Sequence, residues 1–152
     1  MKPTNDFAAS ILQAADLVQR SQWRQAEELL AQVLAANPGE PDGLQLLGLV
    51  REHQDRLADA EALLRQSLVL RPNQPHVQVH LGRILAQAGR HQEAIDLLQA
   101  AAGHDLFDAF VVLAQVQLTV GDFAAAETNY RSALRLAPKS QVALLGLGVL
   151  LN

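Results

Sequence analysis

LLAQVLAANP at residues 29–38 aligns with LLRQSLVLRP at residues 63–72 and with NYRSALRLAP at residues 129–138. The closing prolines of the first two segments lie 34 residues apart, and the third follows after 66 residues, which is two such steps with two residues missing. A degenerate copy, EAIDLLQAAAGHDL at residues 93–106, supplies the intermediate step and has Leu106 at the proline position. A fixed spacing of this length is typical of an array of short structural repeats.

Small residues keep the same spacing at two further positions of the repeat. One column consists of Ala26, Ala60, Ala94 and Ala126, and the other of Ala14, Gly48, Gly82, Ala114 and Gly148. Glycine inside a helix costs about 1 kcal/mol relative to alanine, so its recurrence needs a packing reason. We therefore expect each repeat to be a pair of helices that cross closely at these positions, with Gly48 facing Ala60 across the second pair.

The repeat boundaries predict a single domain over residues 1–152. The repeats cover residues 7–40, 41–74, 75–106 and 107–140, and residues 141–152 form the first helix of an incomplete fifth repeat. The helices expected from this pattern span residues 4–19, 22–36, 41–53, 56–70, 75–87, 90–102, 106–118, 122–136 and 141–151.

Residues with strong turn preferences mark the ends of these helices. Pro41 and Pro75 suit the first helical position, where the N–H that proline lacks would have no partner in any case. Asp55, Asp105 and Asp122 carry carboxylates that accept hydrogen bonds from the first N–H groups of a helix, so each is expected to be an N-cap. The two missing residues are expected beside Asp105, in the joint between the third and fourth repeats.

The composition agrees with an all-α protein and excludes several classes of function. The 152 residues include 28 leucines and 25 alanines, which favour helix, and no cysteine, so disulfides and cysteine-ligated zinc are excluded. The net charge is −4, so no basic surface suited to nucleic acid is expected. No apolar run approaches the roughly 20 residues that span a bilayer. Since no catalytic or nucleotide-binding motif occurs either, we expect a cytoplasmic protein without cofactor, metal or catalytic residues.

In these columns the chain resembles the tetratricopeptide repeat, a helical repeat of 34 residues. The second repeat matches the family pattern at Gly48, Ala60 and Pro72, and the fourth matches it at Ala126 and Tyr130. The resemblance implies an all-α, right-handed superhelical solenoid of antiparallel helix pairs, with about four repeats plus one extra helix. The tyrosine that the family places in the middle of the first helix is absent, and its column holds Leu17, Arg51, Leu85 and Gln117.

The resemblance also implies that the first helix of each repeat lines a concave groove. The groove candidates are Gln45, Leu49, Glu52, His53, His76, Val79, Arg83, Val111 and Gln115. Further positions on the same face are Ala8, Ile11, Ala15, Val18, Gln19, Asp42, Ala86, Gln87, Asp108, Leu118 and Thr119. Such a surface cradles an extended or helical peptide. Arg83 is its best electrostatic anchor, which predicts a neutral or mildly acidic ligand.

The function implied by the resemblance is a scaffold that binds a peptide or a partner protein. The alternative is an N-terminal docking or regulatory arm of a larger enzyme, such as a transferase, sulfotransferase or dioxygenase, with this chain as a fragment. A third interpretation is a structural spacer whose groove is only a solvated face. His76 and His80 lie one helical turn apart, but zinc needs three or four protein ligands, so two exposed histidines are expected rather than a metal site.

The last helix, residues 141–151, is expected to be unusually apolar. Gly148 lies in the column that receives the second helix of a repeat, and no such helix follows. Terminal repeats of solenoids ordinarily present a polar outer face, and large exposed apolar patches mark interfaces. We therefore expect either that the natural protein continues past Asn152 or that this helix forms a homodimer. The candidates for self-association are Leu144, Leu147, Leu150 and Leu151.

Overall fold

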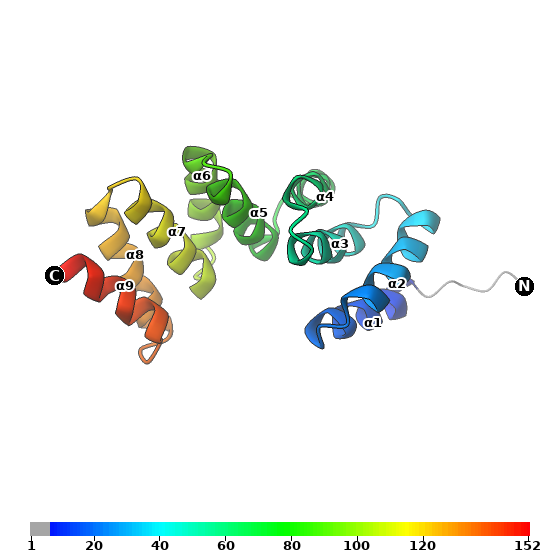
Figure 1. The fold of residues 1–152 in the computed structure, drawn as a ribbon, viewed down its shortest axis with the longest axis horizontal. Coiled ribbons are helices and arrows are strands. Elements are labelled where there is room, and N and C mark those ends of the chain that lie inside the picture. The colour runs from blue at the N-terminus through cyan, green and yellow to red at the C-terminus, as the bar shows by residue number, and fades with distance from the viewer. Residues whose placement is uncertain (1–6) are drawn as a thin grey trace, which may run out of the picture. The chain divides into compact units, whose positions relative to one another are not determined.

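The computed structural model describes residues 7–152, and its helices follow the predicted repeats (Figure 1). The described residues form nine α-helices and no strand: α1 (Phe7–Gln19), α2 (Trp23–Ala36), α3 (Pro41–His53), α4 (Leu57–Leu70), α5 (Pro75–Gln87), α6 (His91–Ala102), α7 (Phe107–Thr119), α8 (Phe123–Leu136) and α9 (Gln141–Leu151). The predicted all-α class is thereby confirmed. Residues 4–6, the start of the first expected helix, lie outside the described residues.

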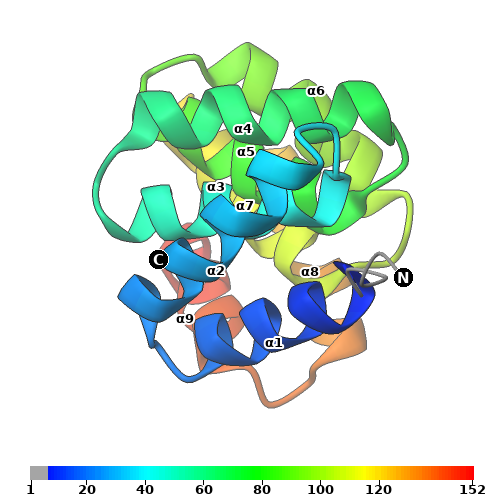
Figure 2. The same ribbon diagram turned by 90° about the vertical axis from the view of Figure 1, so that its right-hand side faces the viewer.

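The helices fall into two compact units, each built from antiparallel pairs. The first unit ends at Asn73 and holds α1 to α4, and the second begins at Gln74 and holds α5 to α9. In the first unit α1 packs on α2 and α3 on α4, as Figure 2 shows, while in the second α5 packs on α6, α7 on α8, and α9 on α8. Of the helices described, none has both the length and the apolar character needed to cross a bilayer.

The turn inside each helix pair is one recurring backbone structure with a residue in the left-handed region. The residues with positive φ in these turns are Ser21 (58°), Asp55 (59°), Gly89 (77°) and Gly121 (83°). The N–H of Asp55 donates to the carbonyl oxygen of Glu52 at 3.0 Å. The N–H of Arg56 donates to the carbonyl oxygen of Arg51 at 2.9 Å, which completes a Schellman motif. The prediction that Asp55 caps α4 is wrong, because Asp55 ends α3 and Arg56 occupies the N-cap position.

Of the other two predicted N-caps, one is wrong and one is confirmed. Asp105 also has a positive φ of 53°, and Leu106 follows it as the N-cap of α7, so the capping role predicted for Asp105 is wrong. The prediction for Asp122 is confirmed, since its carboxylate accepts a hydrogen bond from the N–H of Ala125 at 3.2 Å. Glu40 caps α3 in the same manner, although a glutamate was not expected there. Both prolines expected at a first helical position begin helices.

The two missing residues shorten a helix and leave the joint intact. Helix α6 has 12 residues, whereas α2, α4 and α8 each have 14. The joint between α6 and α7 keeps residues 103–106, as long as the joints before α3, α5 and α9. The expectation of a shortened joint is therefore wrong. A helix loses only about 3 Å of length with two residues, at 1.5 Å per residue, and its packed face is unchanged.

The recurring glycines allow the two helices of a pair to approach closely. A Cβ atom at Gly48 would lie 2.8 Å from Leu64, and one at Gly82 would lie 2.7 Å from Leu98. Both leucines are fully buried. At Gly48 the side chain that fills this place is Leu64, and the expected neighbour Ala60 lies beside it with its carbonyl oxygen 3.7 Å from that Cβ position.

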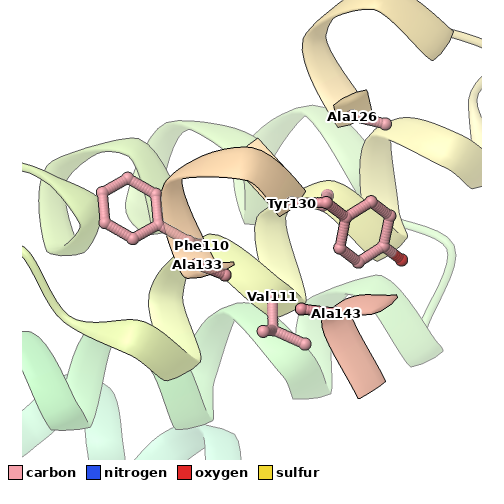
Figure 3. Packing of buried hydrophobic residues seen from close by; sticks show 7 residues of the cluster. Phe110, Val111, Ala126, Tyr130, Ala133 and Ala143 are labelled. Carbon is pink, nitrogen blue, oxygen red and sulfur yellow. The ribbon is translucent and has the colours of Figure 1, made fainter. Parts of the chain in front are cut away.

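On α8 the aromatic ring of Tyr130 takes the place of the buried leucine that α4 and α6 carry. Tyr130 of α8 lies in a cluster with Phe110, Val111 and Ala143 (Figure 3). The ring lies against Gly146 of α9, where a side chain would collide with it. Burial raises the pKa of the Tyr130 hydroxyl. The pairing of a large residue on α8 with the absence of a side chain on α9 thus joins the last helix to the second unit.

Candidate functional site

The second unit contains an open cavity of about 350 Å³ between α5, α7 and the start of α6, which we call the α5–α7 pocket. Its lining consists of Arg83, Ala86, Gln87, His91, Val112, Gln115, Val116 and Thr119. Val112 and Val116 are buried, whereas Gln87, Gln115 and Thr119 are exposed. The pocket therefore has an apolar floor and a polar rim, and its volume lies in the range of binding sites for small ligands and side chains.

Helical spacing explains why these side chains share one pocket. Residues three and four positions apart lie on the same face of a helix, and Arg83, Ala86 and Gln87 have this spacing on α5. The lining residues of α7, residues 112–119, follow the same rule. Because α5 and α7 pack directly on one another, the two faces meet. His91 completes the pocket as the first residue of α6.

The structure brings part of the predicted groove together and buries another part. Arg83 and Gln115 both line the α5–α7 pocket. Val79 and Val111, which were expected to line the groove, are instead core residues that are only 3% and 7% exposed. For Val111 the reason is α9, because Ala143 of that helix belongs to the same buried cluster. Neither valine is among the residues that line the α5–α7 pocket.

In the first unit the predicted groove residues lie on α3. Gln45, Leu49 and Glu52 are half-buried, and His53 at the end of the helix is exposed. The imidazole of His53 stacks on the indole of Trp23, with ring centroids 4.0 Å apart and an interplanar angle of 15°. Sequence reasoning did not foresee this stack, because Trp23 lies outside every column of the family pattern.

A second hollow lies at the start of the first unit. It has a volume of about 370 Å³ and is lined by Phe7, Ala8, Ile11, Leu12, Glu40 and Asp42. Ala8 and Ile11 are predicted groove positions of the first repeat, and they contribute apolar surface to this hollow. Asp42 is paired with Arg71 through a hydrogen bond of 2.7 Å, so its carboxylate is already engaged.

In the second and fourth repeats a polar residue, Arg51 or Gln117, occupies the column in which the family has a tyrosine. Arg51 of α3 forms a short ion pair with Glu27 of α2, and Gln54 donates to the same carboxylate at 2.8 Å. The Arg51 guanidinium, and after it the Gln54 amide, hold the pKa of Glu27 below its ordinary value of 4.5. In the second unit Gln117 is buried in this column and accepts a hydrogen bond from Asn129 at 2.7 Å. Hydrogen bonds thus replace aromatic packing at this position in the second and fourth repeats, whereas Leu17 and Leu85 keep it apolar in the first and third.

The histidines singled out as a possible metal pair are on α5. His76 is exposed and His80 is half-buried. Within residues 7–152 no group of three or more histidine, cysteine, aspartate and glutamate side chains is arranged to hold a metal ion. Among these residues, His76 and His80 therefore have no further ligands with which to form a metal site.

The four leucines proposed for self-association differ in how far they are exposed. Leu144 and Leu151 are exposed, whereas Leu147 and Leu150 pack in part against the Tyr130 cluster. A Cβ at Gly148 would meet nothing within 4 Å, unlike its counterparts Gly48 and Gly82. Two other exposed residues of α9, Leu145 and Val149, add to the apolar surface.

Three residues of the α5–α7 pocket were not anticipated as groove residues, namely His91, Val112 and Val116. Ala86, Gln87 and Thr119 were placed on the groove face by the family pattern, and all three line the pocket. His91 escaped notice because it belongs to a second helix of a repeat, whereas the groove was expected from first helices alone. Its alignment with Trp23 in the repeats is the signal that identifies it.

Comparison with known families gives the same repeat. The pattern of the tetratricopeptide repeat matches residues 11–75 and 111–152. A second pattern with the same description matches residues 53–115. Among curated proteins, the cellulose synthase operon protein C of Pseudomonas fluorescens is 29% identical to this chain over 140 residues. That match covers 86% of this chain and 11% of the relative, so the chain spans about a tenth of the relative's length.

Solved structures resemble the chain over nearly its whole length. The structure of PilF from Pseudomonas aeruginosa aligns with a TM-score of 0.88 at 24% identity, and it covers 95% of this chain and 67% of that one. YrrB, described as a tetratricopeptide repeat protein with an unusual peptide-binding site, aligns with a TM-score of 0.80 at 16% identity, covering 98% of this chain and 78% of that one. At these identities the likeness establishes the fold alone.

Proposed function

Because this chain belongs to the tetratricopeptide repeat family, we propose that it is a protein-interaction module that binds a peptide segment of a partner in the α5–α7 pocket. The observation that carries the proposal is the pocket itself, with a buried apolar floor at Val112 and Val116 and an exposed polar rim. Apolar floors bind side chains, and polar rims pair with the backbone of an extended peptide. YrrB, a protein of the same repeat fold, is described as having a peptide-binding site, and this supports a peptide as the ligand.

The lining also bears on the charge of the ligand. Arg83 is the one permanently charged side chain among the residues that line the pocket, and none of them carries a carboxylate. Complementary charges guide association and exclude wrong partners. We therefore expect a neutral or mildly acidic peptide segment and poor binding of a basic one.

A second proposal concerns the setting in which the module works. The cellulose synthase operon protein C is a far longer protein, and the region like this chain is 11% of it. This favours a role in which the repeats dock a partner on behalf of a larger protein, such as the transferase, sulfotransferase or dioxygenase considered above. The cytoplasmic location and the lack of nucleic-acid binding stay predictions from composition.

The proposal is tested by selecting peptides against the full chain and measuring their affinity for two charge-reversal variants. Arg83→Glu replaces the charge at the pocket, and Arg24→Glu makes the same change at an exposed residue of α2 as the control. We expect Arg83→Glu to weaken binding about tenfold, the effect of losing one charge-assisted contact of about 1.4 kcal/mol, with the melting temperature almost unchanged. Peptides that bind both variants equally would assign binding to another surface.

A further inference from the structure

The surroundings of the α5–α7 pocket in the second unit have a counterpart in the first unit, because the repeats bring the same positions together in both. His91 begins α6 as Trp23 begins α2, and these residues are two repeat steps apart. Thr119 ends α7 as His53 ends α3, again two steps apart once the two missing residues are counted. The α5–α7 pocket and the stack of Trp23 on His53 therefore occupy equivalent places in two sets of three helices.

Several of the side chains around this place are smaller in the second unit. At four of the eight lining positions the first unit carries the larger residue, and the pairs are Val18 and Ala86, Trp23 and His91, Leu46 and Val112, and His53 and Thr119. The reverse holds at one position, where Ala15 of the first unit corresponds to Arg83 of the second. The floor residue is the same in both units, since Val50 and Val116 are equivalent and both are buried. The first unit thus fills the place with two stacked rings, whereas the second leaves a hollow of about 350 Å³.

From this comparison we infer that the α5–α7 pocket receives an aromatic or imidazole side chain of a bound peptide, laid against the ring of His91 as His53 lies against Trp23. The inference rests on the proposed function and specifies which residue of the peptide the pocket selects. The missing ring is the one at the position of Thr119, so the guest ring takes the place that His53 takes in the first unit.

The chemistry of the pocket suits a flat ring. Ala86, Val112 and Val116 bury its apolar surface, and stacked aromatic pairs gain attraction beyond the burial of area. The Nδ1 atom of His91 is buried and has no hydrogen-bond partner within residues 7–152. Because a buried nitrogen is out of reach of a ligand, the guest ring is held by packing and not by a hydrogen bond to Nδ1. Arg83 lies in the same lining, and arginine is attracted to the faces of aromatic rings.

The inference can be tested with two small probes on the full chain. N-acetyltryptophanamide and N-acetylleucinamide share a backbone and differ in the side chain, and their binding is followed by NMR shifts of the His91, Val112 and Val116 signals. We expect the tryptophan probe to bind about fivefold to tenfold more tightly, the added attraction of a stacked ring. Equal binding of the two probes, or shifts at other residues only, would overturn the inference.

A pair of matched variants tests the equivalence of the two units. Thr119→His restores the residue of the first unit and fills the pocket from within, so we expect it to reduce binding of the tryptophan probe at least fivefold. Thr128→His is the control, because Thr128 is also exposed and, like Thr119, donates to the carbonyl oxygen four residues earlier, but it does not line the pocket. Equal effects of the two variants would contradict the inference, and melting curves verify that both fold.

The selected peptides separate this inference from the proposed function. Suppose that their binding is weakened by Arg83→Glu but not by Thr119→His, and that they share no aromatic residue. The pocket is then a peptide site without a ring subsite, and the inference fails while the proposed function stands. Binding that is indifferent to Arg83→Glu removes the proposed function itself. Peptides enriched in tryptophan, tyrosine, phenylalanine or histidine that lose affinity with Thr119→His support both.

Discussion

Trp23 is the only tryptophan of the chain, and its indole lies face to face with the imidazole of His53. Its fluorescence therefore reports on the surroundings of this one indole, which include the His53 ring and the buried cluster of Ala14, Ala26, Leu30 and Val50. We expect His53→Thr to shift the emission to longer wavelength, because the indole face becomes exposed to water, and to cost about 0.5–1.5 kcal/mol of unfolding free energy. His76→Thr, at an exposed histidine of the second unit, serves as the control. An unchanged spectrum for His53→Thr would mean that the rings do not stack in solution.

The ion pair of Arg51 with Glu27 makes part of the stability depend on pH. The pKa of Glu27 is lowered in the folded chain, so its contribution is full above the ordinary value of 4.5 and is lost as the pH falls through the folded pKa. We expect Arg51→Met to lower the unfolding free energy by about 1–2 kcal/mol at pH 7, between the values for exposed pairs and for hydrogen bonds to charged groups. Urea titrations near pH 7 and pH 3 measure the effect.

The loss should shrink toward pH 3, because the carboxyl of Glu27 takes up a proton as the pH falls through its lowered folded pKa and the ion pair is then lost. A loss of equal size at both pH values would instead assign the role of Arg51 to packing of its methylene groups. Arg24→Met is the control for this experiment, because Arg24 pairs with Glu28 in a largely exposed position and its removal is expected to have little effect at either pH.

Among the helices, two glycines of one column allow a direct test of close packing. A Cβ at Gly82 would lie 2.7 Å from Leu98, whereas a Cβ at Gly148 would meet nothing within 4 Å. Alanine favours helix over glycine by about 1 kcal/mol. We expect Gly148→Ala to raise the melting temperature, and Gly82→Ala to lower it because overpacking costs about 1–3 kcal/mol. If both variants gained stability, α5 and α6 would not cross at Gly82.

The helices could be predicted from the sequence because repetition supplies several aligned copies of each boundary. The turns were harder, since an aspartate suits both an N-cap and the left-handed residue that ends a helix. Asp122 takes the first role and Asp55 the second, and the glycines at 89 and 121 in the column of Asp55 were the signal that separates them. The site of the two missing residues could not be foreseen, because a shorter helix and a shorter joint leave the same gap in the alignment.

For the molecule as a whole, the candidate site was predicted in part. Arg83 and Gln115 followed from the groove pattern, which describes the positions that face outward from first helices. The prediction that Val79 and Val111 line the groove is wrong, because burial depends on the neighbouring helix as well as on the position in the repeat. The pocket itself arises from a difference in side-chain volume between equivalent places, so only a comparison of Thr119 with His53 in three dimensions reveals it.

The apolar surface of α9 yields the last prediction, which concerns self-association. Leu145 and Val149 are 71% and 67% exposed and lie one turn apart on the same face, whereas Leu147 packs in part against the Tyr130 cluster. Exposed apolar patches favour association. We expect light scattering to detect dimers of this chain that increase with concentration, and the double variant Leu145→Glu, Val149→Glu to remain monomeric with an unchanged melting temperature.

Leu147→Glu provides the contrast that separates association from folding. It would place a charge against the Tyr130 cluster, and a charge without a partner in an apolar cluster is costly. We therefore expect this variant to melt at a lower temperature than wild type. Wild-type chains that stay monomeric at every concentration would contradict a dimer through α9. An unchanged melting temperature for Leu147→Glu would contradict the packing of α9 on α8, because the same face cannot be both buried against Tyr130 and indifferent to charge.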